Sequence, residues 1–184
     1  MKQTIILIAV AMISFWACQN VANRKAGSDI VITGDSAHSN NPYYSHTDTT
    51  VLHVSDTEWA KILPDSIYQV ARNKATEDAF SGKFWNYTGI GTYYCTACGN
   101  TLFRSDAKFA SSCGWPSFFE TERKNSVVYA ADDSHGMERT EVLCGRCGSH
   151  LGHLFDDGPA PTGKRFCMNS LVLDFIPDDT SKAK

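Results

Sequence analysis

Two pairs of cysteines constrain the fold of this 184-residue chain more than any other feature. Each pair has the spacing Cys-x-x-Cys and is followed by glycine; Cys95 and Cys98 form the first, and Cys144 and Cys147 form the second. The glycine lets the backbone turn so that its amide groups point toward sulfur. Two such turns supply the four thiolates of a tetrahedral site, so the sequence predicts one structural Zn²⁺ held by all four cysteines.

The number of residues between the two cysteine pairs indicates the role of the metal. Residues 99–143 lie between them, a longer stretch than the loop of common zinc ribbons. The fold must therefore bring the pairs together, and the zinc would stabilise the folded domain by linking them. The alternative is two redox-active or disulfide-bonded pairs, which an exported protein permits. The identical form of the two pairs, and the protection that a closed zinc site gives its thiolates, favour zinc.

Short apolar and aromatic segments surround the cysteine pairs. Glycine, asparagine, aspartate and proline separate them, as in chains of short strands joined by turns. The segments are residues 92–95, 101–103, 126–130, 140–144 and 165–175. This pattern predicts a mainly β fold, in the form of a small antiparallel β-barrel-like domain.

Two short helices are expected before the strands. Ser55 and Glu58 have the spacing of a capping box, and Trp59 follows on the apolar face of the helix that it would begin. Pro64 suits the first turn of a second helix, in which apolar residues repeat at helical spacing. Both helices are interpreted as packing elements.

Composition limits the domain count and the partners. With 42% hydrophobic and 20% charged residues, the chain can bury one core of ordinary size. A net charge of −3 and a pI near 6.0 do not provide the basic surface that phosphate contacts require. We therefore expect a single domain and no nucleic-acid partner.

The N-terminus has the features of an export signal. Lys2 precedes an apolar run over residues 5–13, which is too short to span a bilayer and suits the core of a signal peptide. Residues 14–18 follow this run and end at Cys18 in a pattern that resembles the lipobox of bacterial lipoproteins. Phe15 and Trp16 depart from that pattern, so a plain secretory signal or an uncleaved anchor remains the alternative. We expect residues 1–17 to be a signal peptide, and the exported protein to be periplasmic or on the cell surface, anchored only through lipidated Cys18.

Residues 18–54 are predicted to be a polar tether, and residues 55–178 to be the domain. The tether is rich in Asn, Ser, Asp, Thr and His and has no sustained hydrophobic period. His38, His46 and His53 are too scattered to indicate a metal site, so they are interpreted as part of a solvated linker.

A reactive face is predicted at residues 165–169. If this stretch is extended, its period of two places Arg165, Cys167 and Asn169 on one face and Phe166 and Met168 on the other, toward the core. A cation two residues from a cysteine favours the thiolate, which is the nucleophilic form. The alternative is an inert buried cysteine beside a solvated arginine.

The cysteine count isolates two thiols. Of the seven cysteines, Cys18 is assigned to lipid and four to zinc, which leaves Cys113 and Cys167 for thiol–disulfide chemistry. That chemistry requires a nucleophile and a resolving thiol. His150 and His153 lie near Cys167 in the sequence and could supply or shuttle the proton that it needs.

Residues 56–175 resemble the B-type methionine-R-sulfoxide reductases. The matching motifs, in order along the chain, are Thr-Glu-Asp-Ala-Phe-Ser-Gly at residues 76–82, both cysteine pairs, Cys-Gly-Trp-Pro-Ser-Phe, His-Leu-Gly-His-x-Phe-Asp-Asp-Gly-Pro and Arg-x-Cys-x-Asn. The resemblance implies a mainly antiparallel β fold with N-terminal helices and zinc on the four paired cysteines.

The resemblance also implies roles for single residues. Cys167 matches the catalytic cysteine, Cys113 the resolving cysteine, and Trp115 the residue that packs on the substrate methyl group. Phe166 stands where the family often has tyrosine and is assigned to the substrate site. The polar positions of the active site correspond to His150, His153, Asp157, Arg165 and Asn169.

The implied activity is reduction of the R epimer of methionine sulfoxide, free or protein-bound, to methionine. Cys167 would become a sulfenic acid, then form a disulfide with Cys113, and a thioredoxin-like reductant would recycle the enzyme. Two alternatives stay open. One is a zinc hydrolase with His150, His153 and Asp157 as ligands, and the other is a non-enzymatic zinc-ribbon interaction module.

Overall fold

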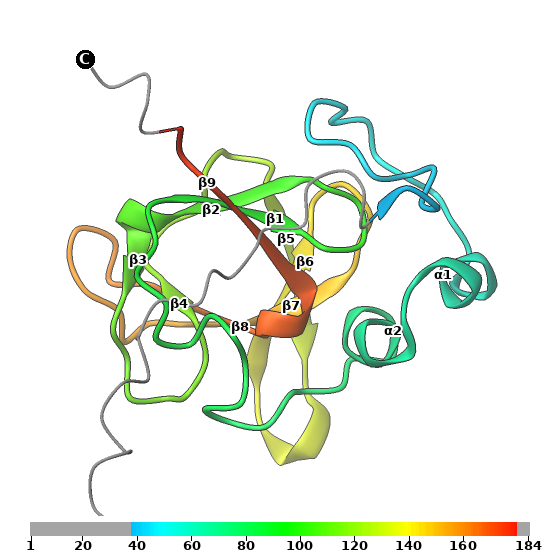
Figure 1. Ribbon diagram of the computed structural model, residues 1–184. Coiled ribbons are helices and arrows are strands. Elements are labelled where there is room, and N and C mark those ends of the chain that lie inside the picture. The colour runs from blue at the N-terminus through cyan, green and yellow to red at the C-terminus, as the bar shows by residue number, and fades with distance from the viewer. Residues whose placement is uncertain (1–37, 180–184) are drawn as a thin grey trace, which may run out of the picture. The chain divides into compact units, whose positions relative to one another are not determined.

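The computed structural model describes residues 38–179, apart from the side chain of His135 (Figure 1). The predicted signal peptide, Cys18 and the first part of the predicted tether lie outside the described residues. Within residues 38–179, none of the helices has the length and apolar character needed to cross a bilayer.

Two short helices precede the strands, as expected. The first, α1 (Asp56–Ile62), begins at an N-cap formed by Ser55, whose hydroxyl accepts a hydrogen bond of 3.2 Å from the Glu58 amide. Trp59 on α1 is fully buried, so this helix is anchored in the core.

The second helix, α2 (Asp65–Ala71), follows immediately. Pro64 occupies its N-cap, one position before the first turn in which the sequence placed it. Val70 and Ala71 are buried, and α2 contacts the 3-10 turn at residues 170–172 and the strand at residues 150–155, which carries both candidate histidines. Both helices are packing elements, as predicted.

The strands form two antiparallel sheets. One has the order β2-β1-β9, and the other β3-β4-β8-β7-β6-β5. The bounds are β1 (Gly91–Cys95), β2 (Thr101–Arg104), β3 (Lys108–Phe109), β4 (Ser117–Phe118), β5 (Val127–Asp132), β6 (Arg139–Cys144), β7 (His150–Phe155), β8 (Arg165–Met168) and β9 (Leu173–Pro177). The prediction of a mainly β, antiparallel domain with two short helices is confirmed. Strand pairing over residues 38–179 gives two open sheets, without a closed barrel.

The segment 165–175 does not form one strand. It divides into β8, a 3-10 turn η4 (Ser170–Val172) and β9, and the two strands belong to different sheets. Glu77 explains the break, because its carboxylate accepts hydrogen bonds from the amides of Ser170 at 2.7 Å and Leu171 at 3.0 Å. These amides are turned away from a strand ladder, so the chain changes sheets at η4 (Figure 1).

Aromatic side chains join the two sheets in one core. Tyr93 of β1 and Phe103 of β2 come from the three-stranded sheet, and Phe118 of β4 comes from the other. The Phe118 ring stacks on Phe103 with centroids 4.3 Å apart and meets the edge of Tyr93 at 4.9 Å. All three are fully buried, and each such side chain contributes roughly 1.5 to 3 kcal/mol.

Residues 38–54, here named the strap, lie against the domain and next to α1 (Figure 1). The Tyr43 ring meets Trp59 with centroids 5.4 Å apart, and Leu52 and Val54 pack on the core. His38 is paired with Asp174 at 2.9 Å. This part of the predicted tether therefore differs from a solvated linker, because its few apolar side chains, spaced without a period, are enough to hold it down.

Candidate active site and metal centre

The two unassigned thiols meet at one place in the fold. Cys113 lies in the loop before β4 and Cys167 lies on β8, and their sulfur atoms are 3.5 Å apart. Both thiols are free and half-buried. A disulfide bond is about 2.05 Å long, so the two sulfurs must come closer to form one. A small side-chain rotation would bring them together.

The alternation predicted for β8 is confirmed. Arg165 and Cys167 are half-buried, whereas Phe166 and Met168 are buried in the core. Phe166 therefore lies on the opposite face from the Cys167 sulfur, with its ring 5.7 Å from that of Phe103. The sequence led us to expect Phe166 at the substrate site, whereas its ring lies in the core.

Neighbouring strands place a hydroxyl and an imidazole on either side of the thiol. In the ladders, Cys167 is opposite Ser117 of β4 and opposite His153 of β7. Gly152 lets β7 come this close, because a Cβ there would lie 2.0 Å from the Cys167 carbonyl oxygen. The sheet thus presents both groups beside the candidate nucleophile.

A β-bulge brings the two histidines together. Val142 pairs with Gly152 and Leu143 pairs with His150, so Leu151 is an extra residue on β7. The extra residue shifts the alternation of faces, and the rings of His150 and His153 lie 5.4 Å apart. Without the bulge, a separation of three residues would place them on opposite faces.

A buried carboxylate orients His150. Glu141 approaches Nδ1 at 2.7 Å and also accepts a hydrogen bond from Lys74 at 2.8 Å. Burial lowers the pKa of His150 below its ordinary value, although Glu141 opposes this, so the ring is neutral at pH 7. Its Nε2 is buried and has no hydrogen-bond partner within the described part of the chain.

A second carboxylate orients His153. Asp132 lies 2.7 Å from its Nε2 and also accepts a hydrogen bond of 2.7 Å from Arg139. Hydrogen bonds from Ser134 and His153 hold the pKa of Asp132 well below its ordinary range, so the carboxylate stays ionised. This carboxylate therefore fixes the orientation of the His153 ring.

The two thiols differ in their tendency to ionise. Burial, followed by the charge and the hydrogen bond of Cys113, raises the pKa of Cys167 to about 12, and Arg165 only partly offsets this. Burial also opposes ionisation of Cys113, but hydrogen bonds led by those from Ser111 and Ser117 lower its pKa to about 7. The sequence led us to expect a thiolate at Cys167. In the free dithiol, however, the two pKa shifts favour the thiolate at Cys113.

Arg165 is fixed by an ion pair. Its Nε and Nη2 donate to the two carboxylate oxygens of Asp157 at 2.8 Å and 2.9 Å, and its guanidinium lies 4.3 Å from the Phe155 ring centroid. Arg165 lowers the pKa of Asp157 in turn. The structure thus uses Asp157 to hold the cation that stands two residues from Cys167.

Asn169 lies beyond the end of β8 and is buried. Its side chain accepts a hydrogen bond from the Glu77 amide at 3.0 Å and donates one to the Leu151 carbonyl at 3.1 Å. The indole of Trp115 donates to the Glu77 carbonyl at 3.1 Å. Asn169 therefore does not share the open face of Cys167, and Glu77 is a site-positioning residue to which sequence reasoning gave no role.

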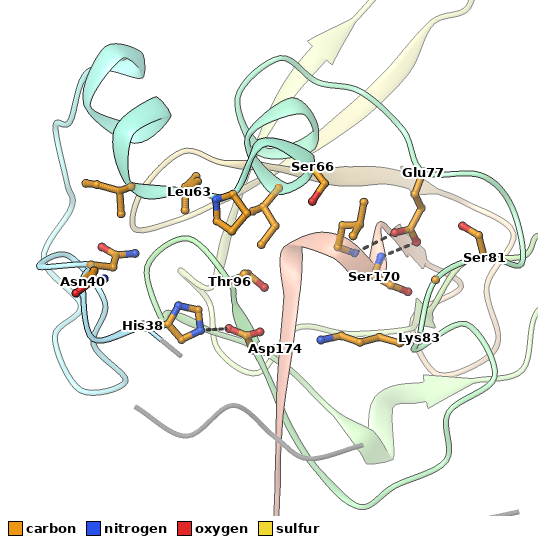
Figure 2. A pocket seen from close by; sticks show the side chains of 16 residues that line it. His38, Asn40, Leu63, Ser66, Glu77, Ser81, Lys83, Thr96, Ser170 and Asp174 are labelled. Atoms are coloured by element: carbon orange, nitrogen blue, oxygen red, sulfur yellow. Dashed lines mark hydrogen bonds and ion pairs between the residues drawn. The ribbon is translucent and has the colours of Figure 1, made fainter. Parts of the chain in front are cut away.

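The larger of the described cavities, about 580 Å³, is separate from the thiols (Figure 2). Its walls come from the strap, α1, α2, the segment around Glu77, the turn after β1, η4 and β9, and they include neither thiol and neither of the two oriented histidines. The Glu77 carboxylate points toward Ser170 on this side (Figure 2). On its other side, the Glu77 backbone holds Trp115 and Asn169.

The four paired cysteines converge. Sulfur atoms of Cys95 and Cys147 are 3.7 Å apart, those of Cys98 and Cys144 are 3.6 Å apart, and all four lie within 4.8 Å of one another. A tetrahedron with metal–sulfur bonds of about 2.3 Å has edges of about 3.8 Å, so the spacing fits a metal ion. All four side chains are buried, and the predicted four-cysteine cluster is confirmed.

Glycines and polar groups shape this cluster. Gly99 and Gly148 have φ angles of +75° and +70°, the left-handed conformation that the tight turns need. Asn100 lies 3.5 Å from the Cys144 sulfur, and Ser149 lies 3.2 Å from that of Cys147. Hydrogen bonds to sulfur would partly neutralise four thiolates around a dication.

The fold and these two sites together define one class of protein. Its members combine an antiparallel β domain and a four-thiolate metal centre with a half-exposed dithiol beside two carboxylate-oriented histidines. The chain belongs to the SelR domain family, whose profile matches residues 63–177.

Curated relatives agree with this membership. A peptide methionine sulfoxide reductase MsrB of Leptospira interrogans is 51% identical over 124 residues, which cover 67% of this chain and 95% of the relative. The protein of the same name from Thiobacillus denitrificans is 50% identical over 125 residues, covering 68% and 95%. That from Methanosarcina barkeri is 50% identical over 128 residues, covering 70% and 90%.

Proposed function

We propose that this chain reduces the R epimer of methionine sulfoxide to methionine. The observation that carries the proposal is the 3.5 Å approach of the Cys113 and Cys167 sulfurs beside two oriented histidines. A pair at this distance can take two electrons from an external dithiol and pass them to the sulfoxide sulfur, whose oxygen leaves as water. The family membership and the names of the relatives support the substrate class, and the choice of epimer rests on the family.

The first step uses Cys167 as nucleophile. Cys167 releases its proton to solvent as the substrate enters, and Arg165 favours the resulting charge against the raised pKa. The thiolate attacks the sulfoxide sulfur, and His153 protonates the sulfoxide oxygen. The position of His153 opposite Cys167, with Asp132 behind it, supports this role. The protonated oxygen then passes from the substrate sulfur to the Cys167 sulfur as the bond between the two sulfurs breaks, so methionine departs and Cys167 becomes a sulfenic acid.

The second step regenerates the dithiol. The Cys113 thiolate attacks the sulfenic sulfur, a disulfide forms, and the oxygen leaves as water after taking one proton. An external dithiol then reduces the disulfide by exchange and becomes a disulfide itself. In an exported enzyme we propose a thioredoxin-like domain, supplied with electrons through a membrane carrier, as this reductant. Trp115, anchored on the Glu77 carbonyl, is proposed to contact the substrate methyl group.

We propose that the four-cysteine cluster holds one structural zinc ion. Four buried thiolates with nearly tetrahedral spacing are the usual donor set for this metal. The ion leaves no open position for a substrate in such a set, so it stabilises the fold and takes no part in the reaction.

Neither alternative is favoured. A zinc hydrolase would need His150, His153 and Asp157 to converge, but each has a separate partner: Glu141, Asp132 and Arg165, respectively. In the part of the chain that the structure describes, only the four-cysteine group converges as a metal ligand set. A purely structural interaction module would leave the adjacent thiols without a role.

An epimer-resolved assay with dithiothreitol tests the proposal. The full chain should convert the R epimer of a blocked methionine sulfoxide and leave the S epimer unchanged. Cys167→Ser should abolish methionine formation, because a hydroxyl at neutral pH is neither ionised nor soft enough to attack sulfur. In a single turnover without dithiothreitol, Cys113→Ser should still release about one equivalent of methionine per enzyme, because only the second step is blocked. A methionine burst without Cys167 would contradict the assignment.

A further inference from the structure

Two serine hydroxyls surround the sulfur of Cys113. The Ser111 Oγ lies 2.9 Å from that sulfur and 2.7 Å from the Ser117 Oγ, and the Ser117 Oγ is itself 3.5 Å from the sulfur. The three atoms form a closed triangle of hydrogen-bonding distances. Ser111 comes from the loop before Cys113, and Ser117 begins β4.

Ser117 is fixed more firmly than an exposed serine would be. Its side chain is fully buried, and its strand position is directly opposite Cys167. Its Oγ also lies 3.3 Å from the Trp115 carbonyl, which can accept its proton. Because each hydroxyl carries one proton, Ser117 can donate to the Ser111 oxygen while Ser111 donates to the Cys113 sulfur, so Ser117 orients Ser111 toward that sulfur.

We propose that Ser111 and Ser117 act as positioning residues that hold Cys113 as a thiolate, ready to attack the sulfenic acid on Cys167. The proposal rests on the proposed function, in which that attack forms the disulfide. It assigns the resolving step, rather than attack on the substrate, to this hydroxyl pair.

The order of the reaction makes the serines necessary. In the free dithiol, the Cys167 thiol also lies within hydrogen-bonding distance of Cys113. After methionine leaves, Cys167 carries a sulfenic acid, so that thiol can no longer donate. The hydroxyls remain in place. With Cys113 already ionised, sulfur–sulfur bond formation needs only one proton from solvent, which leaves with the sulfenic oxygen as water.

The electrostatics of the free dithiol agree with this role. Although burial opposes the charge, hydrogen bonds from Ser111, from Ser117 and at the Trp115 backbone lower the pKa of Cys113 to about 7. An ordinary cysteine has a pKa of about 8.5. The lowered pKa increases the share of Cys113 that is ionised near neutral pH.

A single-turnover experiment on the full chain separates the steps. Reduced enzyme is mixed with one equivalent of R-epimer substrate, and methionine, sulfenic acid trapped by dimedone, and disulfide are measured over time. In Ser111→Ala the methionine burst should remain near one equivalent, while disulfide formation at pH 7 slows on the order of tenfold and trapped sulfenic acid rises. Ser111→Thr keeps the hydroxyl and should restore the rate.

Ser112→Ala is the matched control, because Ser112 is exposed and adjacent. It should form the disulfide at the unmodified rate. A pH series gives the readout that a loss of packing would not produce: disulfide formation in Ser111→Ala should rise with pH toward the unmodified rate, because alkali restores the Cys113 thiolate without the hydroxyl.

The outcomes distinguish the two proposals. Disulfide formation that is unchanged in Ser111→Ala, or slowed equally at every pH and in Ser111→Thr, would overturn the role of the hydroxyls and leave the reductase function intact. Loss of the methionine burst from the unmodified enzyme would instead overturn the proposed function.

Discussion

Gly152 is the residue that lets the histidine strand lie against the thiol strand. It has a φ of +157°, and an added Cβ would lie 2.0 Å from the Cys167 carbonyl oxygen. The nearest atoms are backbone atoms of Cys167 and Met168 on β8, which cannot turn aside as a flexible side chain could. The distance between His153 and Cys167 therefore depends on the absence of a side chain at Gly152.

We predict that Gly152→Ala lowers the free energy of unfolding by about 2 kcal/mol or more and removes most reductase activity, because β7 must move away from β8. Gly163→Ala is the control. Gly163 has a φ of +67° but open space around its Cβ position, so only the backbone cost of about 1 kcal/mol applies and activity should persist. Denaturant unfolding and turnover measure both; equal effects of the two changes would contradict the clash.

Single residues were partly predictable. The alternation over Arg165, Cys167 and the core residue Met168 follows from the period of a strand, and the structure has it. The contribution of Glu77 was not predictable in this way, because its carboxylate binds amides more than ninety positions along the chain. Long-range hydrogen bonds of this kind leave no periodic signal in the sequence.

At the scale of elements, the strap covers one side of the metal cluster. The guanidinium of Arg146, which lies within the second cysteine pair, donates to the carbonyls of Tyr43 and Cys98 and to the Asp48 carboxylate. The Ser45 amide donates to the Cys98 carbonyl at 3.0 Å. The strap lies outside the family match, so these contacts are an addition to the part of the chain that defines the family.

We predict that deleting all residues before 55 accelerates zinc loss several-fold and lowers stability by roughly 2 kcal/mol or more, because the knuckle carbonyls lose their partners and apolar strap side chains leave the core. A deletion of residues 1–37 keeps the strap and is the control. Zinc transfer to a chromogenic chelator and thermal unfolding measure the effects. Equal zinc release from the two truncated chains would show that the strap does not protect the metal.

Elements were predicted where local pattern decides them. The capped helix α1 and the strands β1, β2, β5 and β6 match predicted segments. Strand β7 was missed, because Gly152 and the Leu151 bulge interrupt its alternation. The run 165–175 looked continuous because each half is apolar, whereas Glu77 bends it between two sheets.

In the whole molecule, the metal cluster joins the turn after β1 to the turn after β6. Because β1 and β6 belong to different sheets, the cluster links the two sheets. We predict that Cys144→Ser loses the zinc and lowers the melting temperature strongly, because metal binding free energy is also folding free energy. Cys113→Ser should retain one zinc per chain and its melting temperature. Metal analysis and thermal unfolding test both, and a folded, active and zinc-free Cys144→Ser protein would remove the structural role.

Attachment to a membrane stays a prediction, since Cys18 lies outside the described residues. We expect Cys18→Ala to move the protein from the membrane fraction to the soluble fraction, because an acyl chain rather than a spanning helix would hold it. Fractionation of cells that express each form measures this. Unchanged membrane retention of the variant would favour an uncleaved anchor.

The sequence by itself determined the residue types and their local spacing: two metal-binding turns, one strand with a thiol on its open face, a helix cap and a set of motifs specific enough to identify the family. These depend on neighbours within a few positions, so local rules suffice. The meeting of Cys113 with Cys167, the bulge that aligns His150 with His153, and the serine hydroxyls around the Cys113 sulfur are known only from the tertiary structure. Those outcomes depend on burial and on contacts between distant segments, which no local pattern encodes.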